Sequence, residues 1–495
     1  MSLRSKFAKN SIWMAFGGAS ENLVQFTTFA VLARMLSVRD LGIVTFTILF
    51  VDFCRVFVNG GLQEAIIQRK EWDEAFASAC FTTNILLALA VSSLFAVIGG
   101  VGLEYAFGPG IGLVAVALAA MFMLSASRSI HVAKLKREFQ YRPLAVRGTI
   151  AAILSGIGAI ALAFAGAGIW ALIFQRLFYE FVTSVLAWRS ARWMPHLSLD
   201  FSALAGTRSF ATRVTLTRGL EILNLRASDF VVGLVFGASA VAIYRVGARA
   251  LDVLRRLLIL PIQDSAFAAF SRLENPRAIG ERFTRLLAVG LFIICPLAFG
   301  TAFIAPELTV LLFGEKYAAS GIVFSILSLA LIPTTLICIS SSAFVAANDP
   351  RSAYRSSLLL VALNIGATAI LAMKFGATGA AIGNLAAQTA LTPYLLAKAR
   401  LKMHADVSKT LASIAVPIFI SASTSAAALL IQTSAQYEIG LIEAIAVKIM
   451  LWSAIYMILT AIFGKENLKK SLRELSEFLP KRVDLLIKKF VFGSV

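Results

Sequence analysis

Apolar runs of about twenty residues recur along the whole chain, separated by short polar stretches. A helix needs roughly 20 apolar residues to cross a lipid bilayer, so each run could form one crossing. The runs lie at 11–33, 41–62, 76–100, 109–130, 146–165, 168–188, 207–234, 238–261, 284–305, 320–346, 354–373, 376–397, 409–432 and 440–463. The pattern predicts an all-α polytopic membrane protein with about fourteen transmembrane helices.

A polar stretch at 191–206 separates two sets of six predicted helices. We expect one lobe at 1–190, a second lobe at 207–400 and a cytoplasmic linker between them. Two further helices occupy 401–463. Residues 464–495 are basic, and their apolar positions recur at helical spacing. This last pattern predicts an amphipathic cytoplasmic tail that lies on the membrane surface.

Composition agrees with the apolar pattern, since 59% of the residues are hydrophobic, 15% are charged and the mean hydropathy is +0.82. A soluble domain would carry about a quarter charged residues. The net charge of +19 would suggest nucleic acid in a soluble protein. Here most of the excess lies in short loops, where membrane topology and anionic phospholipid headgroups explain it, so no nucleic-acid partner is expected.

Lysine and arginine are distributed unevenly between the two sets of predicted loops. With a cytoplasmic N-terminus, the two ends and the loops on their side carry 33 of the 46 basic residues, and the opposite loops carry 4. The cytoplasmic loops are then 63–75, 128–147, 189–213, 262–285, 347–355 and 398–409. Because basic residues are enriched on the cytoplasmic side, both termini should be cytoplasmic.

An internal repeat relates the two predicted lobes. A shift of 200 residues pairs Glu21 with Glu221, Asp52 with Asp252, Arg55 with Arg255 and Gln63 with Gln263. Both members of each pair fall on the same side of the membrane, so the repeat is parallel. Two such halves are typical of transporters that work by alternating access, with the cargo path between the lobes.

Buried charge concentrates in the stretch 207–256, although it is apolar enough to cross a bilayer twice. Steps of four, three and four residues separate Arg245, Arg249, Asp252 and Arg256. This spacing places them on one helix face, and a cationic face suits an anionic cargo. Internal ion pairs and arginines that reach out from helix ends are the alternatives. The candidates for cargo contact are Arg218, Arg226, Arg245, Arg249 and Arg256.

A second set of polar residues could line the cavity or couple transport to H+ or Na+. Its members are Glu21, Asn22, Gln25, Asp52, Arg55, Glu221, Asn224, Asp229, Asp252 and Arg255. The alternatives are local ion pairs, Asp52 with Arg55 and Asp252 with Arg255, and a hydrogen-bonded seam between lobes. Arg176 and Glu180, four residues apart, are also expected to form a local pair.

Motifs for catalysis or metal binding are missing from the sequence. It contains no P-loop, GxSxG, HExxH or CxxC motif. His131, His196 and His404 fall in predicted cytoplasmic loops and are too scattered to bind a metal. We therefore expect a transporter without catalytic residues, metal or cofactor.

Six stretches in order along the chain resemble one family. They are LARMLSVRDLG at 32–42, AIIQRK at 65–70, LKREFQYR at 135–142, GAGIWAL at 166–172, SDFVVG at 228–233 with Tyr244, and LFGEKY at 312–317. Together they are similar to the Wzx-type polysaccharide flippases of the multidrug/oligosaccharidyl-lipid/polysaccharide (MOP) superfamily, in the branch with the colanic acid and succinoglycan exporters. The stretch 207–226 departs from that pattern because it is richer in arginine.

The resemblance implies a flippase for undecaprenyl-diphosphate-linked oligosaccharides in the bacterial inner membrane, serving exopolysaccharide, O-antigen or capsule assembly. It also implies a polysaccharide polymerase and a chain-length regulator as candidate partners. A MATE-like, ion-coupled exporter of drugs or metabolites is the alternative. A membrane glycosyltransferase is disfavoured because no loop is long enough to hold a catalytic domain.

Overall fold

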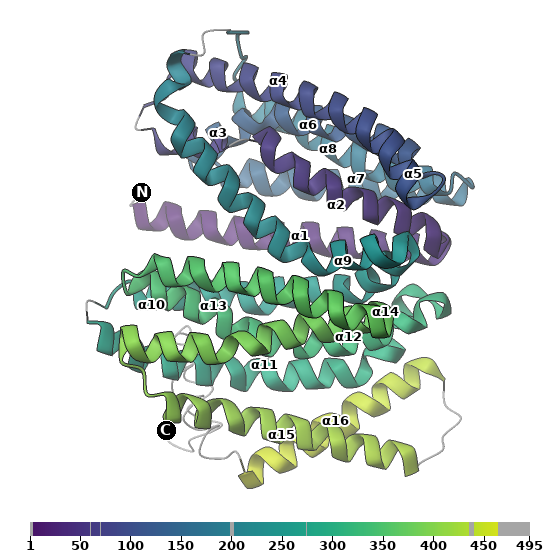
Figure 1. Ribbon diagram of the computed structural model, residues 1–495, viewed down its shortest axis with the longest axis vertical. Helices are drawn as coiled ribbons and strands as arrows, with labels where there is room; N and C mark the ends of the chain where they lie inside the picture. The colour runs from purple at the N-terminus through teal and green to yellow at the C-terminus, as the bar shows by residue number, and fades with distance from the viewer. Residues whose placement is uncertain are drawn as a thin grey trace. The chain divides into compact units, whose positions relative to one another are not determined.

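The computed structural model describes residues 3–59, 61–69, 71–198, 202–273, 275–434 and 440–463. Within these ranges every regular element is a helix, as Figure 1 shows. Eleven helical segments of this described part are long and apolar enough to cross a membrane. The predicted all-α membrane fold is therefore confirmed. The predicted amphipathic tail at 464–495 lies outside the described residues.

Contacts divide the chain into two compact units, which we call unit 1, up to Arg245, and unit 2, from Val246. The division falls inside one long helix, α9 (Arg208–Leu254), and not in the polar stretch at 191–206. The lobe boundaries at 190 and 207 come from the polar stretch in the sequence, and they remain a prediction.

Unit 1 is built from helices that pack side by side. They are α1 (Leu3–Met35), α2 (Val38–Asn59), α3 (Leu62–Gln68), α4 (Glu74–Ile98), the π-helix Gly99–Leu103, α5 (Glu104–Phe107), α6 (Ile111–Arg137), α7 (Tyr141–Phe164), α8 (Ile169–Ala191), the 3-10 helix Ser202–Thr207 and α9 as far as Arg245. Helix α1 packs on α7, α7 on α8, α8 on α6, and α6 on both α2 and α4. Helix α6 thus contacts several other long helices of the unit.

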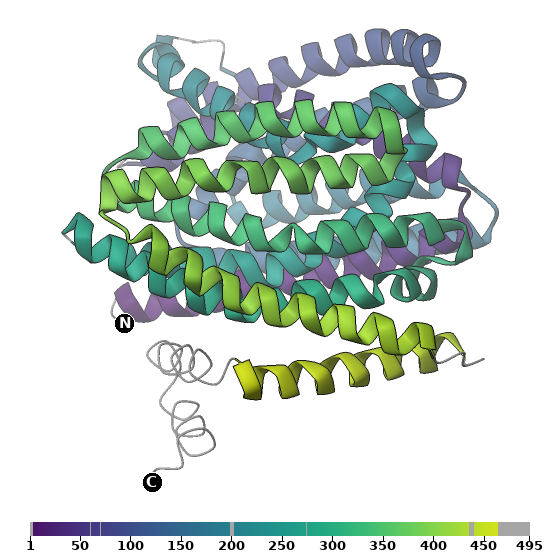
Figure 2. The same ribbon diagram turned by 60° about the horizontal axis from the view of Figure 1, so that its bottom comes forward.

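Unit 2 is organised around one long helix, α11. Its elements are the rest of α9, the π-helix Arg255–Ile259, α10 (Leu260–Phe270), α11 (Pro276–Phe313), the 3-10 helix Glu315–Tyr317, α12 (Ala318–Leu329), α13 (Leu331–Ala346), α14 (Pro350–Met403), α15 (Val407–Ser434) and α16 (Leu441–Phe463). Helix α11 contacts α12, α13, α15 and α16. Figure 2 shows α15 and α16, the two additional helices that the sequence predicts, beside each other.

Two of the longest helices fold back on themselves at a glycine. The backbone of Gly237 in α9 has φ 77°, and that of Gly376 in α14 has φ 59°, which favours glycine. A Cβ atom at Gly383 would lie 2.6 Å from the Cα atom of Thr368, fifteen residues earlier. In a straight helix these positions would be about 22 Å apart. Each of these helices is therefore a hairpin that could cross the membrane twice, and the total of fourteen crossings remains a prediction.

We expect Gly383→Ala to lower the free energy of unfolding by about 1–3 kcal/mol, the usual effect of overpacking. The new methyl group would meet backbone atoms of Ala367 and Thr368, which cannot move independently of the helix. The denaturation temperature in detergent measures this effect. Gly366→Ala in the same helix is the control, because nothing lies within 4 Å of its Cβ position. Equal destabilisation by the two changes would contradict the tight hairpin.

Aspartates precede two helices of unit 2 outside the membrane-spanning segments. Asp349 accepts a hydrogen bond from the backbone N–H of Ser352 at the start of α14. Hydrogen bonds from the Ser408 hydroxyl and the Lys409 backbone N–H hold the pKa of the exposed Asp406 carboxyl at about 2. Asp406 therefore stays charged at physiological pH, which favours the start of α15.

Candidate functional site

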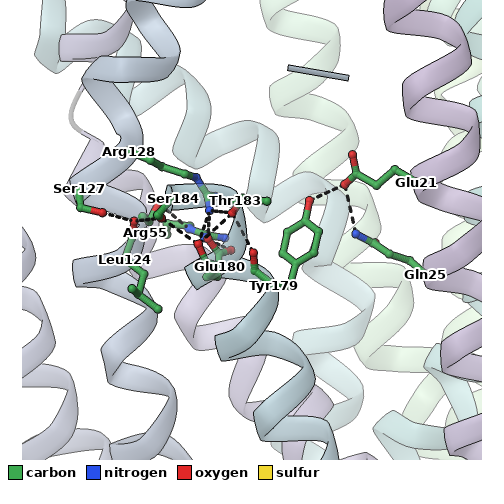
Figure 3. Close-up of polar contacts among 11 residues, drawn as sticks. Glu21, Gln25, Arg55, Leu124, Ser127, Arg128, Tyr179, Glu180, Thr183 and Ser184 are labelled. Carbon is green, nitrogen blue, oxygen red and sulfur yellow. Dashed lines mark hydrogen bonds and ion pairs between the residues drawn. The ribbon is translucent and has the colours of Figure 1, made fainter. Parts of the chain in front are cut away.

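A buried carboxylate lies between three helices of unit 1. Only 4% of the Glu180 side chain, on α8, is exposed. One of its oxygens accepts a hydrogen bond from Arg55 on α2, and the other accepts one from Arg128 on α6. Figure 3 shows the two guanidinium groups converging on this carboxylate. Two positive charges around one negative charge leave this cluster net cationic.

Hydroxyl groups hold the two arginines in place. Arg55 Nε donates to Ser125 Oγ at 3.1 Å, and Arg128 also donates to the Thr183 hydroxyl. Buried ion pairs are stable only when their remaining donors and acceptors are satisfied. The arrangement around Glu180 meets this condition, so it can rigidly join α2, α6 and α8.

Glu21 on α1 forms a separate cluster. The Tyr179 hydroxyl donates to Glu21 Oε1 at 2.5 Å, and Gln25 Nε2 donates to the same oxygen at 3.2 Å. Tyr179 precedes Glu180 on α8 but points toward α1 (Figure 3). Gly148 on α7 leaves room for the carboxylate, because a Cβ atom there would lie 2.1 Å from Glu21 Oε2. The predicted polar pair Glu21 and Gln25 is thus brought together.

A third cluster joins α2 to the hairpin of α9. Arg226 contacts Asp52 at 3.3 Å and Asp229 at 3.4 Å, and Arg245 contacts Asp229 at 3.2 Å. The Asp229 side chain is only 2% exposed. Four residues that the sequence analysis proposed therefore meet in unit 1. Here the two arginines have acid partners, as the alternative of internal pairing expects.

Other candidates lie nearer the surface. Arg218 is 59% exposed and pairs with Glu221 at 3.0 Å and with Glu64 at 3.7 Å. Exposed pairs of this kind contribute little to stability. Asn22 donates to the Gly18 carbonyl at 2.6 Å, within its own helix, and Asn224 is half-buried.

The predicted cationic stripe on α9 is only partly regular. Arg249, Asp252 and Arg255 are half-buried in unit 2, whereas Arg256 is exposed. The α-helix changes to a π-helix at Arg255–Ile259, which alters the rotation per residue. The shared face of Arg245, Arg249, Asp252 and Arg256 therefore remains a prediction.

Three predicted local ion pairs do not form among the described residues. They are Asp52 with Arg55, Arg176 with Glu180, and Asp252 with Arg255. In unit 1 the reason is that a closer partner comes from a neighbouring helix. Glu180 is occupied by arginines of α2 and α6, and Asp52 by an arginine of α9.

The sequence analysis missed two arginines of this region because it placed 128–147 in a loop. In the structure α6 continues to Arg137 and α7 begins at Tyr141, so Arg128 and Arg147 lie within helices. His131 likewise lies inside α6, where its ring stacks on Trp188. The sequence does carry a signal, since neither glycine nor proline occurs from 113 to 142.

These contacts and electrostatic neighbours define what we call the charge network of unit 1. Its members are Arg55, Arg128, Arg147, Arg176, Arg226 and Arg245 with Glu21, Asp52, Glu180 and Asp229. Six arginines thus meet four acids. The network can hold its helices together and still attract an anion.

Unit 2 carries its own polar groups, which the sequence analysis did not single out. Gln388 accepts from Thr334 at 2.6 Å and donates to Asn384 at 2.7 Å, and Asn384 donates to Asn364 at 3.3 Å. These bonds join α13 to the two arms of α14. Elsewhere in unit 2, Lys448 of α16 pairs with Glu307 of α11 at 2.6 Å.

Sequence comparisons relate the chain to polysaccharide biosynthesis. The family model described as polysaccharide biosynthesis protein matches residues 31–322. The succinoglycan biosynthesis transport protein ExoT of Rhizobium meliloti (strain 1021) is 20% identical over 326 residues, which cover 65% of each chain. The lipopolysaccharide biosynthesis protein WzxC of Escherichia coli (strain K12) is 22% identical over 64% of this chain and 65% of that protein. The matches span slightly less than two thirds of these relatives.

Solved structures share the fold. The lipid II flippase MurJ in an inward closed conformation aligns with a TM-score of 0.76 at 13% identity, covering 92% of this chain and 99% of that chain. An inward-facing MATE family multidrug transporter of the MOP superfamily aligns with a TM-score of 0.58 at 14% identity, covering 77% and 94%. The fold is therefore that of the MOP superfamily, as the sequence predicts.

Proposed function

We propose a function from the premise that this chain belongs to the polysaccharide biosynthesis protein family. It is a flippase that moves undecaprenyl-diphosphate-linked oligosaccharides from the cytoplasmic to the periplasmic leaflet of a bacterial inner membrane. Both termini are cytoplasmic, as the excess of basic residues in one set of loops favours. A polysaccharide polymerase and a chain-length regulator are its proposed partners.

The observation that carries the proposal is the positive excess of the charge network. Six arginines against four acids leave two positive charges within helices that are apolar enough to cross a membrane. Charge of this kind inside a membrane protein marks a cargo or ion path. A diphosphate carries about two negative charges, and arginine can bind it through paired hydrogen bonds.

Alternating access is the proposed mechanism. The two lobes would rock around the cargo while the undecaprenyl tail stays in the bilayer. Glu21 is the candidate for H+ coupling, because it is the acid of the network that has no ion pair within the described part of the chain. Protonation there would alter its contact with Tyr179, which joins α1 to α8.

Reconstitution into liposomes tests the proposal. A fluorescent undecaprenyl-diphosphate oligosaccharide is incorporated in both leaflets, and a membrane-impermeant quencher is added outside. We expect the protein to expose the inner-leaflet pool to the quencher, whereas liposomes without protein retain it. If the inner-leaflet lipid is protected from the quencher equally with and without the protein, the result would contradict the flippase function.

The MATE-like exporter is the second candidate, favoured by the shared fold alone. Many drugs that such transporters carry are cations, which the positive excess of the charge network would repel. Uptake of a fluorescent organic cation into the same liposomes separates the two functions. Cation uptake without lipid exposure would favour the exporter.

A further inference from the structure

One arginine of the charge network has a buried, unsatisfied donor. Arg147 lies on α7, and its Nη1 atom is buried without a hydrogen-bond partner among the described residues. The charged groups that act on it are Arg128, Glu21 and Glu180. Both acids already accept bonds from other side chains. A guanidinium offers five donors, so Arg147 keeps capacity for a ligand.

A second arginine of the network lacks a partner altogether. The partly buried Arg176 on α8 makes no hydrogen bond or ion pair with any residue in the described ranges. The acids near it are Asp52 and Glu180, which are held by other arginines. Two more arginines, Arg226 and Arg245, add to its positive surroundings.

The other arginines of the network differ from these two. Each of Arg55, Arg128, Arg226 and Arg245 contacts a carboxylate. Arg147 and Arg176 are therefore the two arginines of the network that contact no carboxylate among the described residues. An unpaired buried charge destabilises a protein, so its presence in a membrane span calls for a function.

The two positions lie at different depths. Helices α7 and α8 pack on each other and are joined by the short turn 165–168, so they run antiparallel. Arg147 lies 17 residues before the end of α7, and Arg176 lies 7 residues after the start of α8. At 1.5 Å per residue, their Cα atoms are offset by about 15 Å along the helices. The two arginines also have different charged neighbours in the network, which favours two separate positions.

We propose that Arg147 and Arg176 are two separate oxyanion-binding positions on the cargo path of unit 1. This inference rests on the proposed function, because it assigns the groups that grip that cargo. The bound oxyanion comes from the carrier diphosphate or from a carboxylate of an acidic sugar. The paired arginines of the network hold the helices, and the two unpaired ones hold the cargo.

Anion binding to the purified full-length protein tests the inference. Thermal shifts are measured with inorganic pyrophosphate and with glucuronate, at constant ionic strength. We expect Arg147→Gln or Arg176→Gln to weaken binding of at least one of these anions about tenfold or more, the effect of a lost charge-assisted hydrogen bond. Loss of pyrophosphate binding assigns the position to the carrier, and loss of glucuronate binding assigns it to the sugar.

Matched controls come from exposed arginines of the same helices. Arg142→Gln on α7, near Trp13, and Arg189→Gln on α8 should leave binding unchanged. Lysine at 147 or 176 should restore part of the affinity. It keeps the positive charge but lacks the planar guanidinium group that donates two hydrogen bonds to one oxyanion. Unchanged binding of both anions in both glutamine variants would overturn the inference.

The stability of the free protein provides an independent readout. Because Arg147 has an unsatisfied donor, Arg147→Gln should raise the denaturation temperature without anion by a few degrees, or leave it unchanged. A clear decrease would indicate a structural role and overturn the inference. In the liposome assay, the inference fails and the flippase function stands if both glutamine variants expose the inner-leaflet lipid to the quencher as fast as the wild type. If the wild type exposes no lipid, the flippase function fails instead.

Discussion

Glu180→Gln is expected to prevent the protein from accumulating in the membrane. The change is nearly isosteric, but it removes the one negative charge between Arg55 and Arg128. Leaving a buried charge unpaired lowers stability by about 3–5 kcal/mol, a large part of the total stability of most domains. The measurement is membrane abundance, with the denaturation temperature of any protein that can be purified.

Glu221→Gln is the matched control for this prediction. Glu221 also forms an ion pair with an arginine, Arg218, but both side chains are more than half exposed. Such a pair contributes about 0–1 kcal/mol, so abundance should remain near that of the wild type. If the Glu180→Gln protein accumulates in the membrane to the wild-type level, the cluster around Glu180 does not stabilise unit 1.

The fold was predictable because a bilayer constrains a chain strongly. A membrane-spanning segment must form its backbone hydrogen bonds internally, and its apolar side chains must cover a hydrocarbon core about 30 Å thick. Transmembrane helices are therefore visible in the sequence as apolar runs. The gap between the runs at 207–234 and 238–261 also locates Gly237, where the chain direction reverses. The two runs form the two arms of one helical hairpin. Helix ends were less predictable, since polar residues such as Arg137 and Arg142 extend α6 and α7 beyond their apolar runs.

The candidate site was predictable in composition and not in pairing. Charge in an apolar run marks Asp52, Arg226, Asp229 and Arg245 without any structure. Spacing then suggests local pairs, three or four residues apart, because only those neighbours are known from a sequence. In unit 1, packing brings residues from other helices closer. Arg55 therefore contacts Glu180, which is 125 residues away in the chain.

The functional assignment shifted for the same reason. The sequence favoured Arg226 and Arg245 as cargo ligands, and the structure gives both an acid partner. It leaves Arg147 and Arg176 as the arginines of the network without one, within the described part of the chain. Sequence alone cannot separate a paired arginine from an unpaired one, since both look like isolated charges in apolar runs.

Asp229→Asn should also strongly reduce the amount of protein, by removing the acid that lies between Arg226 and Arg245. Its side chain is 2% exposed, so the loss is again about 3–5 kcal/mol. The exposed Asp264→Asn is the control, with an expected effect within about 0.5 kcal/mol. Membrane abundance is measured together with the polysaccharide that reaches the cell surface.

The double change Asp229→Asn with Arg245→Gln separates stability from transport. It restores the balance of charge and keeps an existing ion pair, because Arg226 still contacts Asp52. We expect abundance to recover toward the wild-type level. If Arg245 only neutralises Asp229, surface polysaccharide should recover in proportion to the protein. If Arg245 also contacts the cargo, the restored protein should export little. The ratio of surface polysaccharide to membrane protein therefore decides whether a paired arginine of this network takes part in transport.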